Sequence, residues 1–311
     1  MEGATIEFMD ESSKINVTYR QFWPQFNKNE NFISQALAGS SFEGEIEVTS
    51  VFETTSQKLL AAALRRFGFP RDKQSVDRAK AEPVRKVWFT GENKRPPHSS
   101  LFDAFISFDQ DPMGGKNCYF PLFYIDLLIS HPEATLRRGL GFPDPQTLLE
   151  PRISQSEKPK GVCAFISNGE PTRLRAIDEL SKWIDVDVYG PWVNKPVPNK
   201  HQIAKGYKYT LCFENDLFPG YITEKIFDCF YSGTVPIYYG APDVEKYIDS
   251  KAFVDFRNFK NFKELDSYLK NISNIEYEKI KNAGKEFIIR GASHFYNSLD
   301  NAVLNFDDHQ L

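Results

Sequence analysis

The hydrophobic pattern of the first half of the chain alternates between strand and helix signals. Ile15, Val17 and Tyr19 alternate with polar residues, as in a half-buried strand. A helix is expected from Ser56, because the apolar residues that follow it recur on one helical face. Further strand signals lie at residues 46–52, 84–90 and 103–108. Strands that alternate with helices predict an α/β unit with a mostly parallel sheet.

The pattern fades from about Ser130 and restarts after residue 160. The stretch between them is rich in Pro, Gly and charge, so we predict a linker there and two domains, residues 1–155 and 156–311. The predicted strands of the second half are residues 162–167, 186–190, 209–213, 234–240 and 252–256. The predicted helices are residues 171–183, 223–232, 262–269, 277–289 and 293–311. Two doubly wound α/β domains would bind ligands at the carboxyl ends of their strands, across a central cleft.

The helix predicted at residues 223–232 begins with an unexpected charge. Thr223 is a suitable N-cap and Gly233 a suitable stop, but a cation as early as Lys225 opposes the helix dipole. The helix that Pro171 should start has the same feature at Arg173. An anion such as a pyrophosphate over both helix starts would explain both cations.

The alternative is that these cations swing away from the helix ends into water, and for one such residue alone it is favoured. Two cations in one domain shift the balance towards an anion site. Arg175 lies two residues after Arg173 and therefore points elsewhere, so we predict a solvated side chain.

Composition and charge limit the possible functions. The chain has 311 residues, of which 41% are hydrophobic and 14% aromatic, enough for two folded cores. With 38 basic and 42 acidic residues the net charge is −4, which gives no broad attraction to nucleic acid or to an anionic bilayer. Any anion site must therefore be local.

The N-terminal sequence and the cysteines suggest a compartment. We find no apolar run long enough to cross a membrane and no signal peptide in MEGATIEFMDESSK, so we expect a soluble, cytoplasmic protein, peripheral to the membrane at most. The four cysteines are far apart and mostly lie in apolar runs, as reduced, buried thiols do. The sequons at Asn16 and Asn271 would then be unused.

Several reaction classes lack their motifs. No GxxxxGK[ST] or GxGxxG loop is present, which argues against kinases, NTPases and dehydrogenases, and no GxSxG elbow supports a hydrolase. The five histidines have no spacing typical of zinc ligands. Two DxD spacings remain. Asp185 and Asp187 are expected on the polar face of a strand, whereas Asp109 and Asp111 follow a strand end, where a metal is harder to dismiss.

Four stretches together resemble one known family. CFENDLFPGYITEKIFDCFYSGTVPIYYGAP (residues 212–242) resembles the signature block of the α-1,3-fucosyltransferases, and VWFTGEN (87–93) resembles their N-domain block. SNGEPTRLRAIDEL (167–180) and INVTYRQFWPQF (15–26) match the family in position and type. This family transfers fucose from GDP-fucose with inversion, so the resemblance implies the GT-B type of fold, with an acceptor domain followed by a donor domain that carries the C-terminal helices.

The resemblance also implies roles for individual residues. Arg173 and Lys225 would hold the diphosphate, Glu224 would bind donor hydroxyls, and Asn215 and Tyr221 would line the donor pocket. The two cations are the ones that the helix-dipole argument selects.

The general base implied by the resemblance is Glu92, just after a strand's carboxyl end. An inverting transfer needs a carboxylate on the acceptor side to take the hydroxyl proton. From the residues alone, an idle turn residue is the favoured alternative. Trp23 is a candidate for acceptor contact, because sugars stack on aromatic rings, whereas Trp88 is expected in the core.

The resulting prediction is an α-1,3-fucosyltransferase that acts on O3 of an N-acetylglucosamine or glucose unit in an N-acetyllactosamine-like acceptor. No cofactor or metal is required in this scheme, although Mn²⁺ or Mg²⁺ could stimulate it. Two alternatives stay open: another nucleotide-sugar donor, and a non-catalytic GDP- or glycan-binding protein of the same fold. The chain lacks the heptad repeats and basic tail of bacterial relatives and the stem and anchor of secretory ones, which favours a microbial cytoplasmic enzyme.

Overall fold

The chain is described here from a computed structural model. The described residues are 15–22, 26, 28, 31, 33, 44–50, 84–97, 100–123, 160–167, 169 and 171–289. They fall into two compact units, Met1–Phe120 with Leu299–Leu311 and Pro121–Ser298, and each is described by itself.

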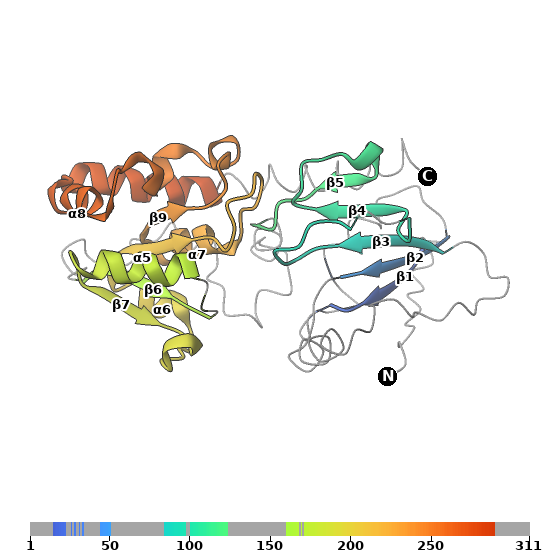
Figure 1. Cartoon of the computed structure of the whole chain (residues 1–311), viewed down its shortest axis with the longest axis horizontal. Helices are drawn as coiled ribbons and strands as arrows, with labels where there is room; N and C mark the ends of the chain where they lie inside the picture. Colours follow the sequence, from blue (N-terminus) through green and yellow to red (C-terminus); the bar gives the residue numbers. More distant parts are fainter. Residues whose placement is uncertain are drawn as a thin grey trace. The chain divides into compact units, whose positions relative to one another are not determined.

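The first unit is built on a parallel sheet (Figure 1). Its strands follow the order of the chain, each pairing with the next. They are β1 (Ile15–Arg20), β2 (Gly44–Thr49), β3 (Arg85–Phe89), β4 (Ala104–Ser107) and β5 (Asn117–Tyr119). The predicted strands of this half are therefore confirmed, and β5 is an addition, because its three residues show no alternation. The helix predicted from Ser56 lies outside the described residues.

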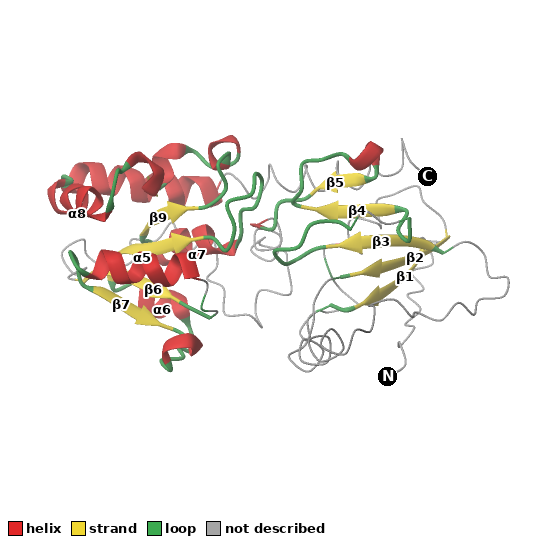
Figure 2. Cartoon of the chain, viewed as in Figure 1, coloured by secondary structure: helices red, strands yellow, loops and turns green. Residues whose placement is uncertain are grey.

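The second unit has a parallel sheet of order β10-β9-β8-β6-β7. Its strands are β6 (Lys160–Phe165), β7 (Val186–Tyr189), β8 (Tyr207–Phe213), β9 (Val235–Tyr239) and β10 (Val254–Asp255). Its helices are α5 (Pro171–Ser181), α6 (Lys200–Ala204), α7 (Glu224–Ser232) and α8 (Phe262–Asn271), and residues 274–289 are also helical. Figure 2 shows this alternation of strand and helix.

Alternate residues of the strands bury opposite faces of this sheet. On β8, Leu211 packs in one core with Leu180 of α5 and Leu265 of α8, whereas Cys212 packs in a second core with Phe227 of α7. Helices thus cover both faces, as the period of two in a buried strand requires. This unit is doubly wound, as predicted.

The boundaries of α7 follow from its sequence. The Thr223 side chain caps the first turn by accepting from the Lys225 amide, and Gly233 ends the helix with φ 64°, a conformation that glycine adopts without strain. Both predictions are confirmed. The short helix α6 was not predicted, because five residues are too few for a periodic pattern. The helix predicted at residues 293–311 lies outside the described residues.

The two units divide ahead of the predicted domain boundary. Pro121 is the first residue of the second unit, and Phe123 is bound to it by a backbone hydrogen bond to Ile222 of 3.1 Å and by a ring stacked on Phe227, with centroids 5.1 Å apart. The predicted boundary at residue 155 lies outside the described residues and stays a prediction. Within the described ranges, we find no helix with the length and apolar character needed to span a bilayer.

Candidate functional site

The candidate site lies at the carboxyl ends of β6 and β8. The chain leaves β6, forms the outer strand β7, and returns to the other side of β6 as β8, so the strand order reverses between β6 and β8. In open α/β sheets this switch point is where ligands bind. The segments that follow the two strands carry Arg173, Asn215, Tyr221, Glu224 and Lys225, the donor-site residues expected from the sequence.

Arg173 is on the first turn of α5, which begins at Pro171 as predicted. Its side chain is buried, and one terminal nitrogen of the guanidinium donates to Oδ1 of Asn215. Asn215 is the second residue after β8 ends, so this bond joins the connection that follows β8 to the start of α5. Arg175 is exposed, as predicted.

Glu214, the first residue after β8, makes most of the polar contacts described for this connection. Its side chain is fully buried and accepts from the Thr223 backbone amide at 2.8 Å and from the Thr223 hydroxyl at 2.8 Å. The ammonium of Lys225 donates to Glu214 Oε2 at 2.9 Å and to Thr223 Oγ1 at 2.9 Å. One carboxylate therefore fixes both the N-cap of α7 and its first-turn lysine.

This pairing corrects part of the sequence interpretation of Lys225. We expected a bound anion to account for a cation on the first turn, but Glu214 already neutralises it. Burial alone would lower the pKa of Lys225, yet the charges of Glu214 and Glu224 raise that pKa above its ordinary value. Lys225 is thus held as a cation, with 22% of its side chain exposed and able to meet a second partner.

Sequence reasoning missed Glu214. It considered only the cations at the helix starts, although a carboxylate that directly follows the buried strand segment TLCF is itself a signal, since a buried charge needs a partner. Lys225, at the start of the next helix, is the partner that the sequence offers.

Glu224 and Tyr221 differ in their exposure. The Glu224 side chain is 46% exposed, with one oxygen 3.9 Å from Lys225 Nζ. Burial raises the pKa of Glu224, but the charges of Lys225 and Lys200 outweigh it and leave that pKa below its ordinary value. Glu224 is therefore an ionised hydrogen-bond acceptor. Tyr221 is buried, so little of its side chain is available to a ligand.

Two glycines allow close packing around the connection after β8: Gly220 lies within it, and Gly240 directly follows β9. The amide of Gly220, which has φ 77°, donates to Asp243 at 2.8 Å and holds the connection against the segment after β9. A Cβ at Gly240 would lie 2.6 Å from Cγ of Glu214 and 2.4 Å from the Tyr238 hydroxyl oxygen. Only glycine leaves room for the buried carboxylate at this point.

Trp192, which sequence reasoning also missed, lies beside the start of α5. It follows β7, and 54% of it is exposed. A Cβ at Gly169 would lie 2.2 Å from the indole, so the ring covers the turn that leads into α5. The edge of the sheet thus presents an aromatic surface beside the connection that carries Arg173.

A buried polar cluster joins α6 to α7 behind this edge. His201 Nδ1 lies 3.2 Å from the Ser232 hydroxyl and its Nε2 lies 3.5 Å from Asp228, which also pairs with Lys200. Burial lowers the pKa of His201 to about 4 and raises the pKa of Asp228 to about 6. The imidazole is neutral at pH 7, and its contacts with Ser232 and Asp228 join α6 to α7.

Glu92 lies in a turn after β3, in the first unit. Its backbone amide and carbonyl bond to the Thr90 hydroxyl, at 3.3 and 2.8 Å, and its carbonyl also accepts from Lys94 at 2.7 Å. The turn is held by the backbone of Glu92, and the side chain is exposed. This geometry suits both the turn residue and the general base that the sequence left open.

The remaining candidates from the sequence are two tryptophans and the aspartates of the two DxD spacings. Trp88 is buried, as predicted, and Trp23 lies outside the described residues. Asp109 and Asp111 accept backbone amides within their own turn, at 3.0 and 2.8 Å. Asp187 accepts from the Tyr207 hydroxyl. In the described part of the chain we find no group of three or more metal-ligating side chains.

The sequence of the second unit matches a known family. Residues 155–281 match the model of "Glycosyltransferase family 10 (fucosyltransferase) C-term". An α-(1,3)-fucosyltransferase of Helicobacter pylori is 31% identical over 246 residues, which are 70% of this chain and 50% of the relative. Human 4-galactosyl-N-acetylglucosaminide 3-α-L-fucosyltransferase 9 is 34% identical over 140 residues, 42% of this chain and 39% of the relative. The chain thus spans half or less of the length of these relatives.

The fold of the whole chain also has a solved counterpart. The crystal structure of an α1,3-fucosyltransferase with GDP-fucose matches with a TM-score of 0.60 at 21% identity, covering 96% of this chain and 94% of that chain. A second crystal structure of an α1,3-fucosyltransferase, with GDP, matches with a TM-score of 0.55. The predicted GT-B fold class and the resemblance to the α-1,3-fucosyltransferases are therefore confirmed.

Proposed function

We propose that this chain, whose residues 155–281 match the glycosyltransferase family 10 (fucosyltransferase) C-terminal model, transfers fucose from GDP-fucose to a sugar hydroxyl. The acceptor is O3 of an N-acetylglucosamine or glucose unit in an N-acetyllactosamine-like glycan, and the anomeric configuration is inverted. The family match and the GDP-fucose complex of a structural relative support this proposal.

One observation carries the proposal in the structure itself. Arg173 and Lys225 come from the first turns of α5 and α7, on either side of the switch point. Helix N-termini and cations together form a site for a diphosphate. We assign the diphosphate to these two side chains and to the first-turn amides.

The other residues of this edge complete the donor site. Glu224, ionised and half exposed, accepts hydrogen bonds from hydroxyl groups of the donor. The ribose hydroxyls are the first candidates. Asn215 holds the Arg173 guanidinium in place. Because Tyr221 is buried, we assign it to the wall behind the donor.

The chemistry then requires only charge stabilisation and a base. As the acceptor oxygen attacks the anomeric carbon, Glu92 takes its proton, and the bond from that carbon to the phosphate oxygen breaks. GDP leaves with the bonding electrons, and Arg173, Lys225 and the helix amides stabilise its developing charge. No general acid is needed for such a leaving group.

The test of Glu92 uses a nearly isosteric change. In Glu92→Gln the amide cannot accept the proton, so the rate of fucosyl transfer to N-acetyllactosamine should fall about 10²- to 10⁴-fold. Because Glu92 contacts its turn through the backbone, the variant should fold normally and bind GDP as the wild type does. A near-normal transfer rate in the folded variant would remove Glu92 as the base.

Two alternatives predict different results. An enzyme that uses another nucleotide sugar would be inhibited by UDP or another nucleotide better than by GDP. A non-catalytic protein would bind GDP without releasing it from GDP-fucose. The presence of both Glu92 and the whole block from Phe213 to Lys225 speaks against the second, because a binding module has no use for a base.

The setting of the enzyme is part of the proposal. We propose that transfer needs no metal, with Mn²⁺ or Mg²⁺ at most stimulating it, so activity should survive EDTA. The four free cysteines, three of them buried, fit a reducing compartment, and we propose a bacterial cytoplasmic enzyme that acts on precursors of cell-surface glycans.

A further inference from the structure

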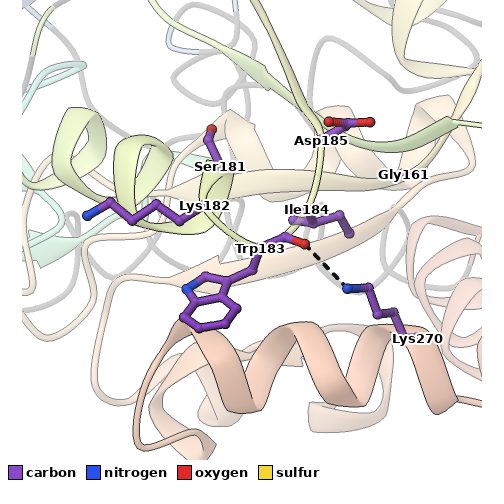
Figure 3. Close-up of a pocket in the computed structure, with 7 residues that line it drawn as sticks. All are labelled: Gly161, Ser181, Lys182, Trp183, Ile184, Asp185 and Lys270. Carbon is purple, nitrogen blue, oxygen red and sulfur yellow. Dashed lines mark hydrogen bonds between the residues drawn. The ribbon is translucent and has the colours of Figure 1, made fainter.

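A cavity lies at the edge of the second unit's sheet opposite the proposed donor site. Its volume is about 450 Å³, and it is lined by Gly161 at the start of β6, by residues 181–185 at the end of α5 and beyond it, and by Lys270 of α8 (Figure 3). Arg173 lies on the first turn of α5 and Ser181 is its last residue, so the helix separates this cavity from the donor residues by about 12 Å. The two sites therefore do not overlap.

The main aromatic surface of this cavity is Trp183, of which 44% is exposed. Its backbone is anchored at both ends: the amide donates to Leu180 at 3.0 Å, and the carbonyl accepts from Lys270 Nζ at 3.3 Å. The ammonium of Lys263 lies 5.5 Å from the ring centroid. An indole has only two side-chain torsions to fix, so it loses little conformational entropy when a ligand stacks on it.

Polar groups accompany the ring. Ser181 and Asp185 also line the cavity, and Figure 3 draws them with Trp183 and Lys270. Asp185 is exposed, and among the described residues no hydrogen bond or ion pair engages its carboxylate. A hydroxyl, a carboxylate and an aromatic ring along one cavity suit a sugar, whose hydroxyls bond to polar groups and whose C–H face packs on an aromatic ring.

The charges favour a neutral ligand over an anion. Lys182 pairs with Glu179 at 2.7 Å, and Lys270 pairs with Asp266 at 2.8 Å. Both cations lie at helix C-termini, where the helix dipole disfavours an anion, unlike Lys225 at the start of α7. The carboxylate of Asp185 would also repel an anion. A phosphate or sulfate gains little here.

We propose that this cavity is a second carbohydrate site, which binds a neutral pyranose unit of the glycan on which the enzyme acts. The identity of this glycan rests on the proposed function, whereas the preference for a neutral sugar rests on the cavity alone. A site remote from the donor residues retains a long glycan between turnovers without taking part in transfer.

The test observes Trp183 directly in the full chain. The protein has four tryptophans, so its ¹⁵N-indole NMR spectrum is simple, and the signal of Trp183 is identified by its loss in Trp183→Phe. Titration with N-acetyllactosamine should shift this signal. In Asp185→Asn the dissociation constant obtained from the shift should rise about five- to tenfold. The indole signal of Trp192, the exposed tryptophan beside the proposed donor site, is identified by its loss in Trp192→Phe and serves as the matched control.

Each result decides the proposal. A Trp183 signal unmoved at tens of millimolar sugar overturns it, and so does a signal that moves with protein concentration instead, which indicates a contact between copies of the chain. A stronger shift with inorganic phosphate than with the sugar contradicts the neutral ligand.

Activity separates this inference from the proposed function. In Trp183→Ala, KM for a polymer of N-acetyllactosamine should rise about fivefold or more at unchanged kcat, while KM for the short acceptor and GDP binding stay as in the wild type. If the wild type transfers no fucose at all, the proposed function fails, and the NMR titration still decides whether the cavity binds sugar.

Discussion

At the scale of single residues, the buried carboxylate of Glu214 organises the donor edge. It accepts from the amide and the hydroxyl of Thr223 and from the ammonium of Lys225, so the N-cap of α7 and the cation to which we assign the diphosphate share one partner. Such a group is costly to bury and more costly to leave unpaired. Its value lies in fixing the position of Lys225 before any ligand arrives.

The contribution of Glu214 can be measured by Glu214→Gln. The amide keeps an acceptor for Thr223 but removes the charge opposite Lys225, so the free energy of unfolding should fall by about 1–3 kcal/mol in urea denaturation. The exposed Glu276→Gln is the control, with an expected change within about 0.5 kcal/mol. Equal stability of both variants would contradict a structural role for the Glu214 charge.

Trp192 gives a second prediction at this scale. Its exposed indole covers Gly169 at the turn into α5, the helix that carries Arg173, so we expect the base of a bound nucleotide to stack on this ring. Loss of one base stack in Trp192→Ala should weaken GDP binding about tenfold in calorimetry. Trp183→Ala, at the opposite edge of the sheet, should bind GDP as the wild type does. Equal GDP affinity of the wild type and Trp192→Ala would place the base elsewhere.

At the scale of elements, the junction of α6 and α7 carries two opposed titrations. His201 has a pKa of about 4, below its ordinary value, so between pH 4 and 6 the unfolded chain binds a proton there that the folded chain does not. Asp228 has a pKa of about 6, above its ordinary value, so the folded chain binds the extra proton. The first effect makes stability rise with pH and the second makes it fall, and together they nearly cancel.

Substitution should reveal each titration separately. In His201→Gln only Asp228 remains, so the free energy of unfolding should fall by up to about 3 kcal/mol from pH 4 to 6. In Asp228→Asn only His201 remains, and the free energy should rise over the same range. Urea denaturation at several pH values measures both. Parallel pH profiles for the two variants would contradict the opposed assignment.

Elements also show how far the sequence alone reaches. The caps of α7 were predictable because Thr223 and Gly233 act through local backbone geometry. The role of Glu214 required one step more, since a carboxylate after a buried strand needs a partner and this partner lies eleven positions further along the chain. Trp192 was missed for a similar reason: its place over Gly169 depends on β7 lying next to β6, a pairing that the strand pattern does not specify.

At the scale of the whole molecule, the second unit has two candidate binding surfaces, one at each end of the strands of its sheet. The carboxyl edge of its sheet holds the switch point with Arg173 and Lys225, and the opposite edge holds the cavity beside Trp183. Glu92 belongs to the first unit. The proposed reaction therefore draws its base from one unit and its donor site from the other, as a two-domain fold allows.

The donor site at the switch point is the central claim, and calorimetric titration with GDP tests it most directly. The wild type should bind GDP more tightly than UDP, and Arg173→Ala should lose about tenfold or more in GDP affinity, since a charge-assisted contact with the diphosphate is removed. Arg175→Ala, exposed on the same helix, is the matched control and should bind GDP as the wild type does. If neither nucleotide binds, or if the folded Arg173→Ala variant binds GDP as tightly as the wild type, the donor site is not at this edge of the sheet.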